Sequence, residues 1–506
     1  LSELHRTLQV NLPMPDATDL KLMLQARIPV IVIETKEEKR ALGLFKQMIN
    51  DSLYQPLFAW SVTQGLFRLD IQTSAQKINA QPQDALAHIK STTLAGIYIL
   101  MDLHPYLEDP LIVRMLREIA QGYDQTQRTL VLISPRLELP PEIRHHAAYL
   151  ELQMPGREQI RQLLLEEVED WKHRNRKPVK GDVKAIDLLM NHLLGLSRAD
   201  AQRLMRNAIY DDGAITHEDI QQVMQAKYRL LGGDGVLSYE VDTAHLADVA
   251  GLDRMKQWLS QRSKVFLSDT PPPGLDPPRG LLLLGVQGAG KSLAAKAVAG
   301  AWHVPLLRLD FATLYNKYYG ETERNLREAL TTAEAMSPCV LWIDEIEKGL
   351  ATDTDDGAGP SKRILGTLLT WMAERKARVF LVATANDIEA LPPELMRKGR
   401  FDEIFFVDLP DTGVREQIFS IHLEKRQQDT ERFDLAALAA ASAGFSGAEI
   451  EQAVVAALYS AHAETVELGD QQLLNELRQT RPLSVVMAEK VAALRAWAQQ
   501  RTVPAH

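Results

Sequence analysis

Short apolar runs alternate with amphipathic helical stretches in two long segments of the chain, at about residues 20–228 and 266–407. In the first segment we expect strands at residues 30–33, 96–101, 129–133 and 148–152. In the second segment we expect strands at residues 281–284, 306–309, 340–343, 379–383 and 404–407. Strands that alternate with helices form parallel sheets with helices on both faces. The pattern therefore predicts an α/β fold class.

The two segments share short sequence matches in the same order along the chain. The matching pairs are residues 139–143 with 391–395, 157–160 with 415–418, and 195–197 with 444–446. Matches at a nearly constant offset are typical of an internal repeat, so we expect two copies of one module.

A glycine-rich stretch, residues 232–235, lies between the two segments and reads as a linker, although a surface loop inside one domain would have the same composition. After residue 407 the pattern becomes helical to the end of the chain. We therefore expect a first module with its own helices, a linker, an α/β subdomain and a C-terminal helical subdomain. Their predicted ranges are 1–230, 231–245, 246–410 and 411–506.

The composition is that of an ordinary globular protein, with 45% hydrophobic and 25% charged residues among 506. A net charge of −10 argues against a general nucleic-acid binder, which usually has a basic excess. The single cysteine, Cys339, excludes an internal disulfide and a cage of thiolate ligands. No membrane span or secretory signal is apparent, so the expected compartment is cytoplasmic.

Residues 285–292 read GVQGAGKS and fit the phosphate-loop pattern G-x-x-x-x-G-K-[ST] between a strand and a helix. The glycines let backbone N–H groups turn toward phosphates at a helix N-terminus. Lys291 is predicted to reach the β- and γ-phosphates, and Ser292 to ligate Mg²⁺. The predicted nucleotide contacts here are Gly285, Val286, Gln287, Gly288, Ala289, Gly290, Lys291, Ser292 and Leu293.

Two carboxylates, Asp344 and Glu345, end the apolar strand at residues 340–343. Asp344 is predicted to hold the metal, and Glu345 to orient or deprotonate the attacking water. Asn386 follows the next strand and is suited to bind the γ-phosphate and the water, although asparagine at a strand end also forms turns.

Arg397 and Arg400 lie in a glycine-containing turn, where exposed basic residues are common. Arginine is suited to bidentate phosphate contact. Because both residues are far from the phosphate loop in sequence, we expect them to act on the nucleotide of a neighbouring subunit.

These motifs, in this order, resemble the AAA family of ATPases, and the two-copy layout resembles the uncharacterised AAA proteins of plastid genomes and bacteria. The resemblance implies tandem AAA modules, each with a five-stranded parallel sheet and a helical lid. It also implies further nucleotide contacts, at Val249, Ala250, Gly251, His422, Gly447 and Ala448.

The family further implies a homo-oligomeric ring, commonly a hexamer, with a pore loop that grips a protein substrate. Tyr318 and Tyr319 stand where that loop belongs, although a tyrosine pair at a helix end also packs into a core. Residues 353–359 are expected to form a second pore loop or a surface loop.

The first copy is expected to be degenerate. Residues 34–38 read ETKEE, which offers no glycine cradle and would repel phosphate. Leu103 is predicted at the position of Glu345, Ser134 at that of Asn386, and Leu164 at that of His422. This copy is therefore predicted neither to bind nor to hydrolyse ATP.

The function predicted is Mg²⁺-dependent ATP hydrolysis that drives remodelling or threading of a protein partner, in the cytoplasm or, in a plastid-bearing source, the stroma. One alternative is a nucleic-acid motor whose tyrosines stack on bases. Another is a scaffold whose assembly is gated by nucleotide and which does little work.

Overall fold

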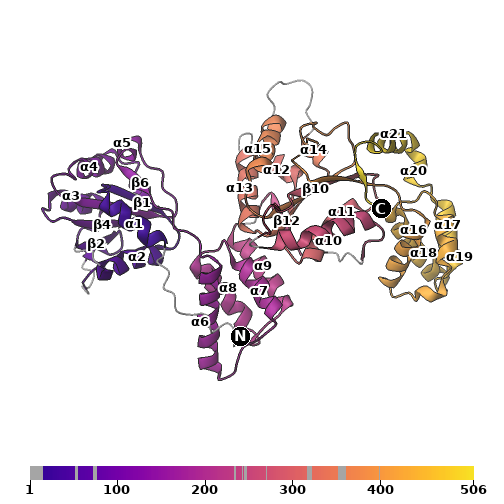
Figure 1. Cartoon of the computed structure of the whole chain (residues 1–506), viewed down its shortest axis with the longest axis horizontal. Coiled ribbons are helices and arrows are strands. Elements are labelled where there is room, and N and C mark those ends of the chain that lie inside the picture. Colours follow the sequence, from indigo (N-terminus) through magenta and orange to yellow (C-terminus); the bar gives the residue numbers. More distant parts are fainter. Residues whose placement is uncertain are drawn as a thin grey trace. The chain divides into compact units, whose positions relative to one another are not determined.

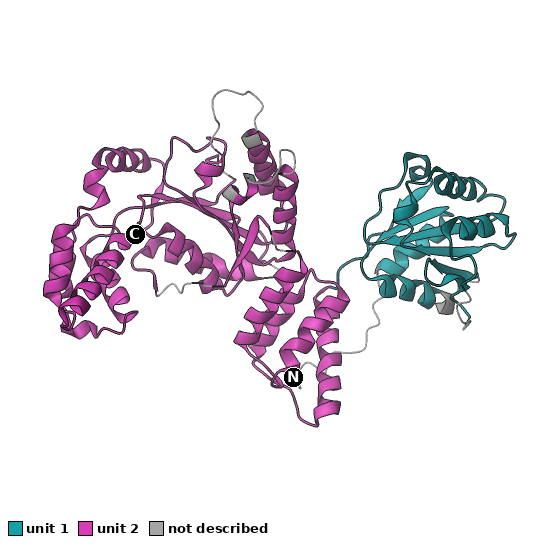
Figure 2. Ribbon diagram, turned by 180° about the vertical axis from the view of Figure 1, so that it is seen from behind, with its two compact units in different colours: residues 1–155 teal, residues 156–506 magenta. Residues whose placement is uncertain are grey.

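The computed structural model describes residues 15–51, 55–71, 77–232, 235–241, 243, 248–268, 271–315, 322–350, 360–397 and 399–506. The chain divides into two compact units, residues 1–155 and 156–506 (Figure 2). The predicted pore tyrosines Tyr318 and Tyr319, and the segment 353–359, lie outside the described residues.

Unit 1 is an α/β domain built on one sheet with the strand order β3-β2-β4-β5-β1-β6. Its strands are β1 (Val30–Glu34), β2 (Leu57–Ser61), β3 (Gly65–Arg68), β4 (Gly96–Met101), β5 (Arg128–Ser134) and β6 (Ala147–Tyr149). All neighbours are parallel except β2 and β3. Its helices are α1 (Pro15–Gln25), α2 (Glu38–Asp51), α3 (Pro82–Ser91), α4 (Pro110–Gln121) and the short α5 (Pro141–Arg144).

The two faces of this sheet are buried under different helices. Ile31 and Ile33 share a core with residues of α1 and α2, whereas Val30 and Val32 share one with residues of α3 and α4. Side chains alternate between the faces of a strand, so strands buried on both faces are apolar throughout.

Unit 2 contains a larger sheet with the order β15-β14-β10-β13-β12-β11-β9. Its strands are β9 (Leu237–Glu240), β10 (Gly280–Gly285), β11 (Leu306–Leu309), β12 (Cys339–Ile343), β13 (Val379–Ala385), β14 (Glu403–Val407) and β15 (Val503–Pro504). Only β9 is antiparallel to its neighbour. The five strands predicted in this segment are all present.

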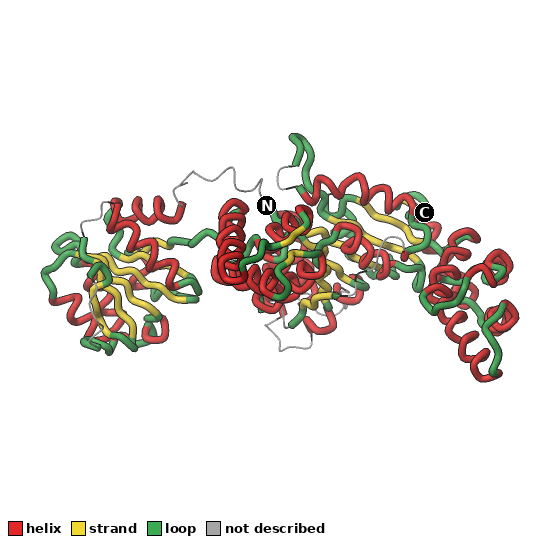
Figure 3. Tube along the Cα trace, turned by 90° about the horizontal axis from the view of Figure 1, so that it is seen from below, coloured by secondary structure: helices red, strands yellow, loops and turns green. Residues whose placement is uncertain are grey.

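Helices cover both faces of this sheet as well, as the tube in Figure 3 shows. Residues of α10 (Asp253–Leu267) and α11 (Lys291–Trp302) share a core with one face. Residues of α13 (Thr322–Ala335), α15 (Pro360–Glu374) and the short α12 (Phe311–Tyr315) and α14 (Ile346–Leu350) share a core with the other.

The strand order shows that the two sheets share one topology. The parallel strands run β6-β1-β5-β4-β2 in unit 1 and β14-β10-β13-β12-β11 in unit 2, and each set has the same order along the chain. The α/β prediction with two related modules is therefore confirmed.

Four helices lie between the two sheets in the sequence: α6 (Arg157–Asn175), α7 (Val183–Leu193), α8 (Arg198–Tyr210) and α9 (His217–Leu230). They have their own apolar core, and they belong to unit 2. The Tyr228 hydroxyl of α9 donates to the carbonyl of Leu237 in β9, and Lys227 is buried beside it. The predicted first module, residues 1–230, thus contains unit 1 and helices that pack with the second sheet.

The C-terminal helices begin with a compact group made of α16 (Thr412–Glu424), α17 (Leu435–Ala441), α18 (Gly447–Glu464) and α19 (Asp470–Gln479). After α20 (Leu483–Val486) and α21 (Ala488–Ala498), the chain returns to the sheet as β15 (Figure 1). Among the helices that the structure describes, none is both long and apolar enough to cross a membrane.

Candidate nucleotide site

The predicted phosphate loop connects β10 to α11 and adopts the backbone that its glycines allow. Gly288 and Gly290 have φ values of 78° and 94°, in the left-handed region that other residues avoid. A Cβ atom at Gly288 would lie 2.8 Å from the Ser446 hydroxyl of the C-terminal helices. The backbone of this loop therefore requires glycine, as its sequence predicts.

Lys291 is the first residue of α11 and is 6% exposed. Its Nζ donates to the carbonyls of Gly285 and Val286, both at 2.8 Å. Burial lowers the pKa of Lys291 to about 8, against the opposing attraction of Glu347, Asp344 and Glu345. The lysine is thus held inside the curve of the loop.

A cavity of about 340 Å³ lies over this loop, between the edge of the sheet and the C-terminal helices. Its lining includes these predicted contacts: Val249, Ala250, Gln287, Gly288, Ala289, Gly290, Lys291, Ser292, Leu293, Asp344, Glu345, Asn386, His422, Gly447 and Ala448. Gly251, Gly285 and Val286 are adjacent in sequence but do not line it. The structure therefore gathers residues from six separate parts of the sequence around one cavity.

The acidic end of the cavity is a connected set of hydrogen bonds. The Ser292 hydroxyl lies 3.2 Å from Asp344 Oδ1, and the Thr384 hydroxyl donates to the same oxygen at 2.6 Å. The Glu345 N–H donates to the Thr384 hydroxyl at 2.9 Å. The sequence analysis did not assign a role to Thr384, because only the alignment of β13 beside β12 brings it to this place.

Asn386 lies against both neighbouring glutamates. Its side-chain Nδ2 donates to Glu345 Oε1 at 2.9 Å, and its backbone N–H donates to Glu347 Oε1 at 2.9 Å. Lys348 forms an ion pair with the other oxygen of Glu345. Glu347, which the sequence analysis missed, is buried, and burial raises its pKa.

The opposite end of the cavity is less polar. His422 lies 3.6 Å from Glu451, and burial lowers the pKa of His422. The Ala448 N–H donates to the Gly288 carbonyl at 3.3 Å, which links α18 to the phosphate loop. Ile418 and Ile421 of α16 add apolar surface. This end is suited to a flat, weakly polar group such as a nucleobase.

The predicted arginines are placed elsewhere. Neither Arg397 nor Arg400 lines the cavity, and Lys291 is the one lysine or arginine among the described residues that do. Arg400 donates to the Leu369 carbonyl of α15, and Arg397 is exposed. Within one chain, these residues are not brought to the predicted site.

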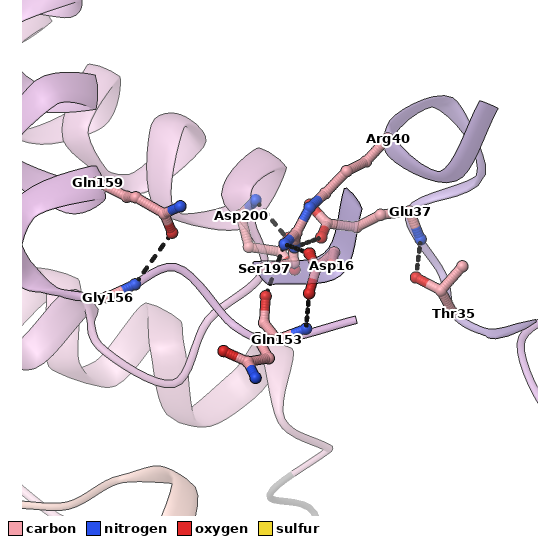
Figure 4. A network of polar contacts seen from close by, with 9 residues as sticks. All are labelled: Asp16, Thr35, Glu37, Arg40, Gln153, Gly156, Gln159, Ser197 and Asp200. Carbon is pink, nitrogen blue, oxygen red and sulfur yellow. Dashed lines mark hydrogen bonds and ion pairs between the residues drawn. The ribbon is translucent and has the colours of Figure 1, made fainter. Parts of the chain in front are cut away.

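Unit 1 has a different structure where the phosphate loop would be. Residues 35–37 alone connect β1 to α2, whereas residues 286–290 connect β10 to α11. Beside the start of α2, Arg40 contacts Asp16, Glu37 and the carbonyl of Gln153 at 2.6–2.9 Å, as Figure 4 shows. A short connection with carboxylates at its end has no cradle for a phosphate.

The register of the two sheets corrects one prediction about unit 1. Met101 and Ile133 pair across β4 and β5 and face the helix that follows β1. In unit 2, Trp342 and Val382 face the equivalent helix α11, so the next residues on that face are Asp344 and Thr384. Asp102 therefore corresponds to Glu345. The prediction of Leu103 at this position was wrong by one residue.

The pairing of the first strand in each sheet gives a second comparison. Ser134 of β5 lies opposite Glu34 of β1, and Ala385 of β13 lies opposite Leu284 of the equivalent strand β10. Ser134 therefore corresponds to Ala385 and not, as predicted, to Asn386. Asp102 and Glu345 also share a left-handed backbone, with φ values of 52° and 48°.

The residues of the cavity fit a nucleotide with a bound magnesium ion. The Ser292 hydroxyl and the Asp344 carboxylate offer adjacent oxygen ligands of the type that Mg²⁺ prefers. The glycine loop leads into the N-terminus of α11, which favours negative charge. The oxygen ligands and the position of the loop at a helix N-terminus therefore both suit a nucleotide phosphate with its metal ion.

Comparison with known proteins gives matches over most of the chain. A family model described as "ATPase family associated with various cellular activities (AAA)" matches residues 281–409. Models of the N-terminal and the second domain of SpoVK-like AAA ATPases match residues 16–152 and 158–234. The boundary between these two models coincides with the division between units 1 and 2.

Two similar proteins span nearly the whole chain. Both are named uncharacterized AAA domain-containing protein ycf46. The protein from Guillardia theta is 35% identical over 95% of this chain and 94% of its own length. The one from Pyropia yezoensis is 34% identical over 95% of this chain and 97% of its own length. A proteasome-activating nucleotidase from Aeropyrum pernix is 37% identical over 37% of this chain and 47% of its own length.

Proposed function

This chain belongs to the AAA family of ATPases, and from that premise we propose that unit 2 binds ATP with Mg²⁺ in the cavity over residues 285–292 and hydrolyses it. The observation that carries the proposal is the set of hydrogen bonds from Ser292 through Asp344 and Thr384 to Glu345. It joins the loop to the two carboxylates at one end of the cavity.

Each residue has a distinct task in the proposed reaction. Lys291 and the loop N–H groups bind the phosphates, and Ser292 and Asp344 hold the metal, which stabilises negative charge on the phosphates when bound. Glu345 accepts a proton from the attacking water at its carboxylate. Asn386, 2.9 Å from Glu345 Oε1, orients that carboxylate and the water.

Arg397 and Arg400 are proposed to complete the site of a neighbouring copy. The support is the charge balance of the cavity. Its described lining contains Asp344, Glu345 and a single lysine, and a bound triphosphate adds more negative charge, so the site lacks positive charge that an arginine would supply. Arg397 is exposed and available to a second chain. This arrangement makes turnover depend on assembly, most simply as a closed ring such as a hexamer.

The proposed use of the energy is to remodel or thread a protein, with Tyr318 and Tyr319 as the gripping residues. This finer step is supported by similarity to proteins named proteasome-activating nucleotidases, which match 37–45% of this chain. A net charge of −10 opposes the alternative of a nucleic-acid motor. The intact Glu345–Asn386 pair opposes the alternative of a scaffold that hydrolyses nothing.

The test is a substrate trap. Glu345→Gln keeps the size of the side chain and removes the base, so this variant should bind ATP, hydrolyse it at least about a hundredfold more slowly, and retain its protein partner. Lys291→Ala is the matched control, because it should bind neither ATP nor partner. Wild-type turnover in the Glu345→Gln variant would refute the assigned base.

A further inference from the structure

Thr384 joins two parts of the acidic end of the cavity through one hydroxyl. The side chain is 1% exposed and lies at the end of β13. Its Oγ1 donates to Asp344 Oδ1 at 2.6 Å and accepts from the Glu345 N–H at 2.9 Å. A hydroxyl has one hydrogen to donate, so this geometry directs that hydrogen to the carboxylate.

Both residues that Thr384 contacts need to be held. Asp344 Oδ1 receives the Thr384 hydroxyl and lies 3.2 Å from the Ser292 hydroxyl, so these two contacts fix the rotation of the carboxylate. Glu345 has a φ of 48°, which is sterically disfavoured for a residue with a side chain. Its backbone direction decides where its own carboxylate points.

Unit 1 shows what the same turn looks like without the hydroxyl. Ile133 corresponds to Thr384, and Asp102 keeps a φ of 52°. There the Asp102 N–H donates to the backbone carbonyl of Ile133 at 2.9 Å. The fold can therefore support this turn through the backbone alone. The additional role of the Thr384 hydroxyl is its bond to Asp344, where unit 1 has Met101.

We propose that Thr384 is a positioning residue for ATP hydrolysis, which acts by holding the metal-binding Asp344 and the base Glu345 in a fixed mutual geometry. The inference rests on the proposed function, since it assigns Thr384 a part in the same reaction. It predicts that loss of the hydroxyl slows turnover more than it weakens nucleotide binding, because misplacement of a base affects chemistry first.

The experiment compares Thr384→Val, which keeps the shape and removes the hydroxyl, with Thr384→Ser, which keeps the hydroxyl. In steady-state assays of the full chain, Thr384→Val should lower kcat about 10- to 100-fold and change KM for ATP less than about threefold. Thr384→Ser should stay within about threefold of the wild-type kcat. Thermal unfolding of each variant is measured alongside, and Thr384→Ala replaces Thr384→Val if the latter does not fold.

The outcomes separate this inference from the proposed function. A wild-type kcat in Thr384→Val, or a loss of kcat that Thr384→Ser shares, overturns the positioning role. A fall in kcat that is matched by a loss of folded protein also overturns it, because it indicates a structural role. If the wild-type chain itself shows no turnover above Glu345→Gln, the proposed function fails instead.

Discussion

Asp102 and Glu345 occupy the same position in two sheets of the same strand order, and both have a left-handed backbone. Their surroundings differ. Glu345 contacts Asn386 and Lys348, and its N–H is held by Thr384, whereas Asp102 lies 4.0 Å from His104 and has Met101 before it. The shape of the turn has been kept in both copies, but the partners needed for hydrolysis are present in one.

This pair gives a matched test of the degenerate copy. Asp102→Asn should leave the ATPase rate unchanged, because unit 1 has no phosphate loop next to this residue. Glu345→Gln should lower the rate by about two orders of magnitude or more. Both changes replace a carboxylate by an amide at the same place in the fold. A steady-state ATPase assay that finds comparable losses would show that unit 1 takes part in hydrolysis.

The phosphate loop can be tested at a single glycine. Gly288→Ala places a Cβ 2.8 Å from the Ser446 hydroxyl at a φ of 78°, so it should weaken ATP binding at least about tenfold. Gly366→Ala in helix α15 is the control, since nothing lies within 4 Å of its Cβ position. That change should leave binding unaltered and raise stability by up to about 1 kcal/mol. Equal nucleotide affinities in the two variants would contradict the assigned loop.

The proposed action of Arg397 on a neighbouring copy can be tested by mixing. Arg397→Ala alone should bind ATP and turn over at least about tenfold more slowly, and Lys291→Ala alone should not bind ATP. In mixed assemblies, some sites combine an intact Lys291 from one copy with an intact Arg397 from its neighbour. The mixture should therefore regain activity that neither variant has. Activity that only averages the two variants would place Arg397 outside the shared site.

His192 predicts a dependence of stability on pH. The side chain is buried, and burial lowers its pKa from 6.5 to about 3. Between these values the unfolded chain binds a proton that the folded chain does not, so the free energy of unfolding falls as pH is lowered from 6.5 toward 3. The full effect is up to about 5 kcal/mol.

Denaturant unfolding at several pH values checks this prediction, with His192→Gln as the reference. The advantage of the wild type over His192→Gln should shrink steadily as pH falls below 6.5, because glutamine does not titrate. A constant difference between pH 7 and pH 4 would show that the burial of His192 does not control this slope.

The parts of the site that are contiguous in sequence could be predicted from it, and the parts created by strand pairing could not. Residues 285–292 and the pair Asp344–Glu345 carry their chemistry in local order. Thr384 and Glu347 were missed. Thr384 gains its role only from the register of β13 against β12. Glu347 follows two other acidic residues closely in sequence, a pattern that is equally typical of a solvent-exposed glutamate, and only the structure shows its bond to the Asn386 N–H.

The one-residue error at Leu103 has a physical cause. Strand β4 reads GIYILM and is buried on both faces, so no alternation of polar and apolar residues sets its phase. The strands β3, β9 and β15 were also missed, because each has at most four residues and lies at the edge of its sheet, where the apolar signal is weak. Strand β2, which reads LFAWS, was missed although it has five residues.

The most direct test is a calorimetric titration of the full chain with ATP and Mg²⁺. The account predicts one nucleotide per chain at saturation, bound in the cavity that contains Lys291, with no binding to Lys291→Ala. Saturation at two nucleotides per chain, binding that survives in Lys291→Ala, or no heat of binding to the wild type would contradict it.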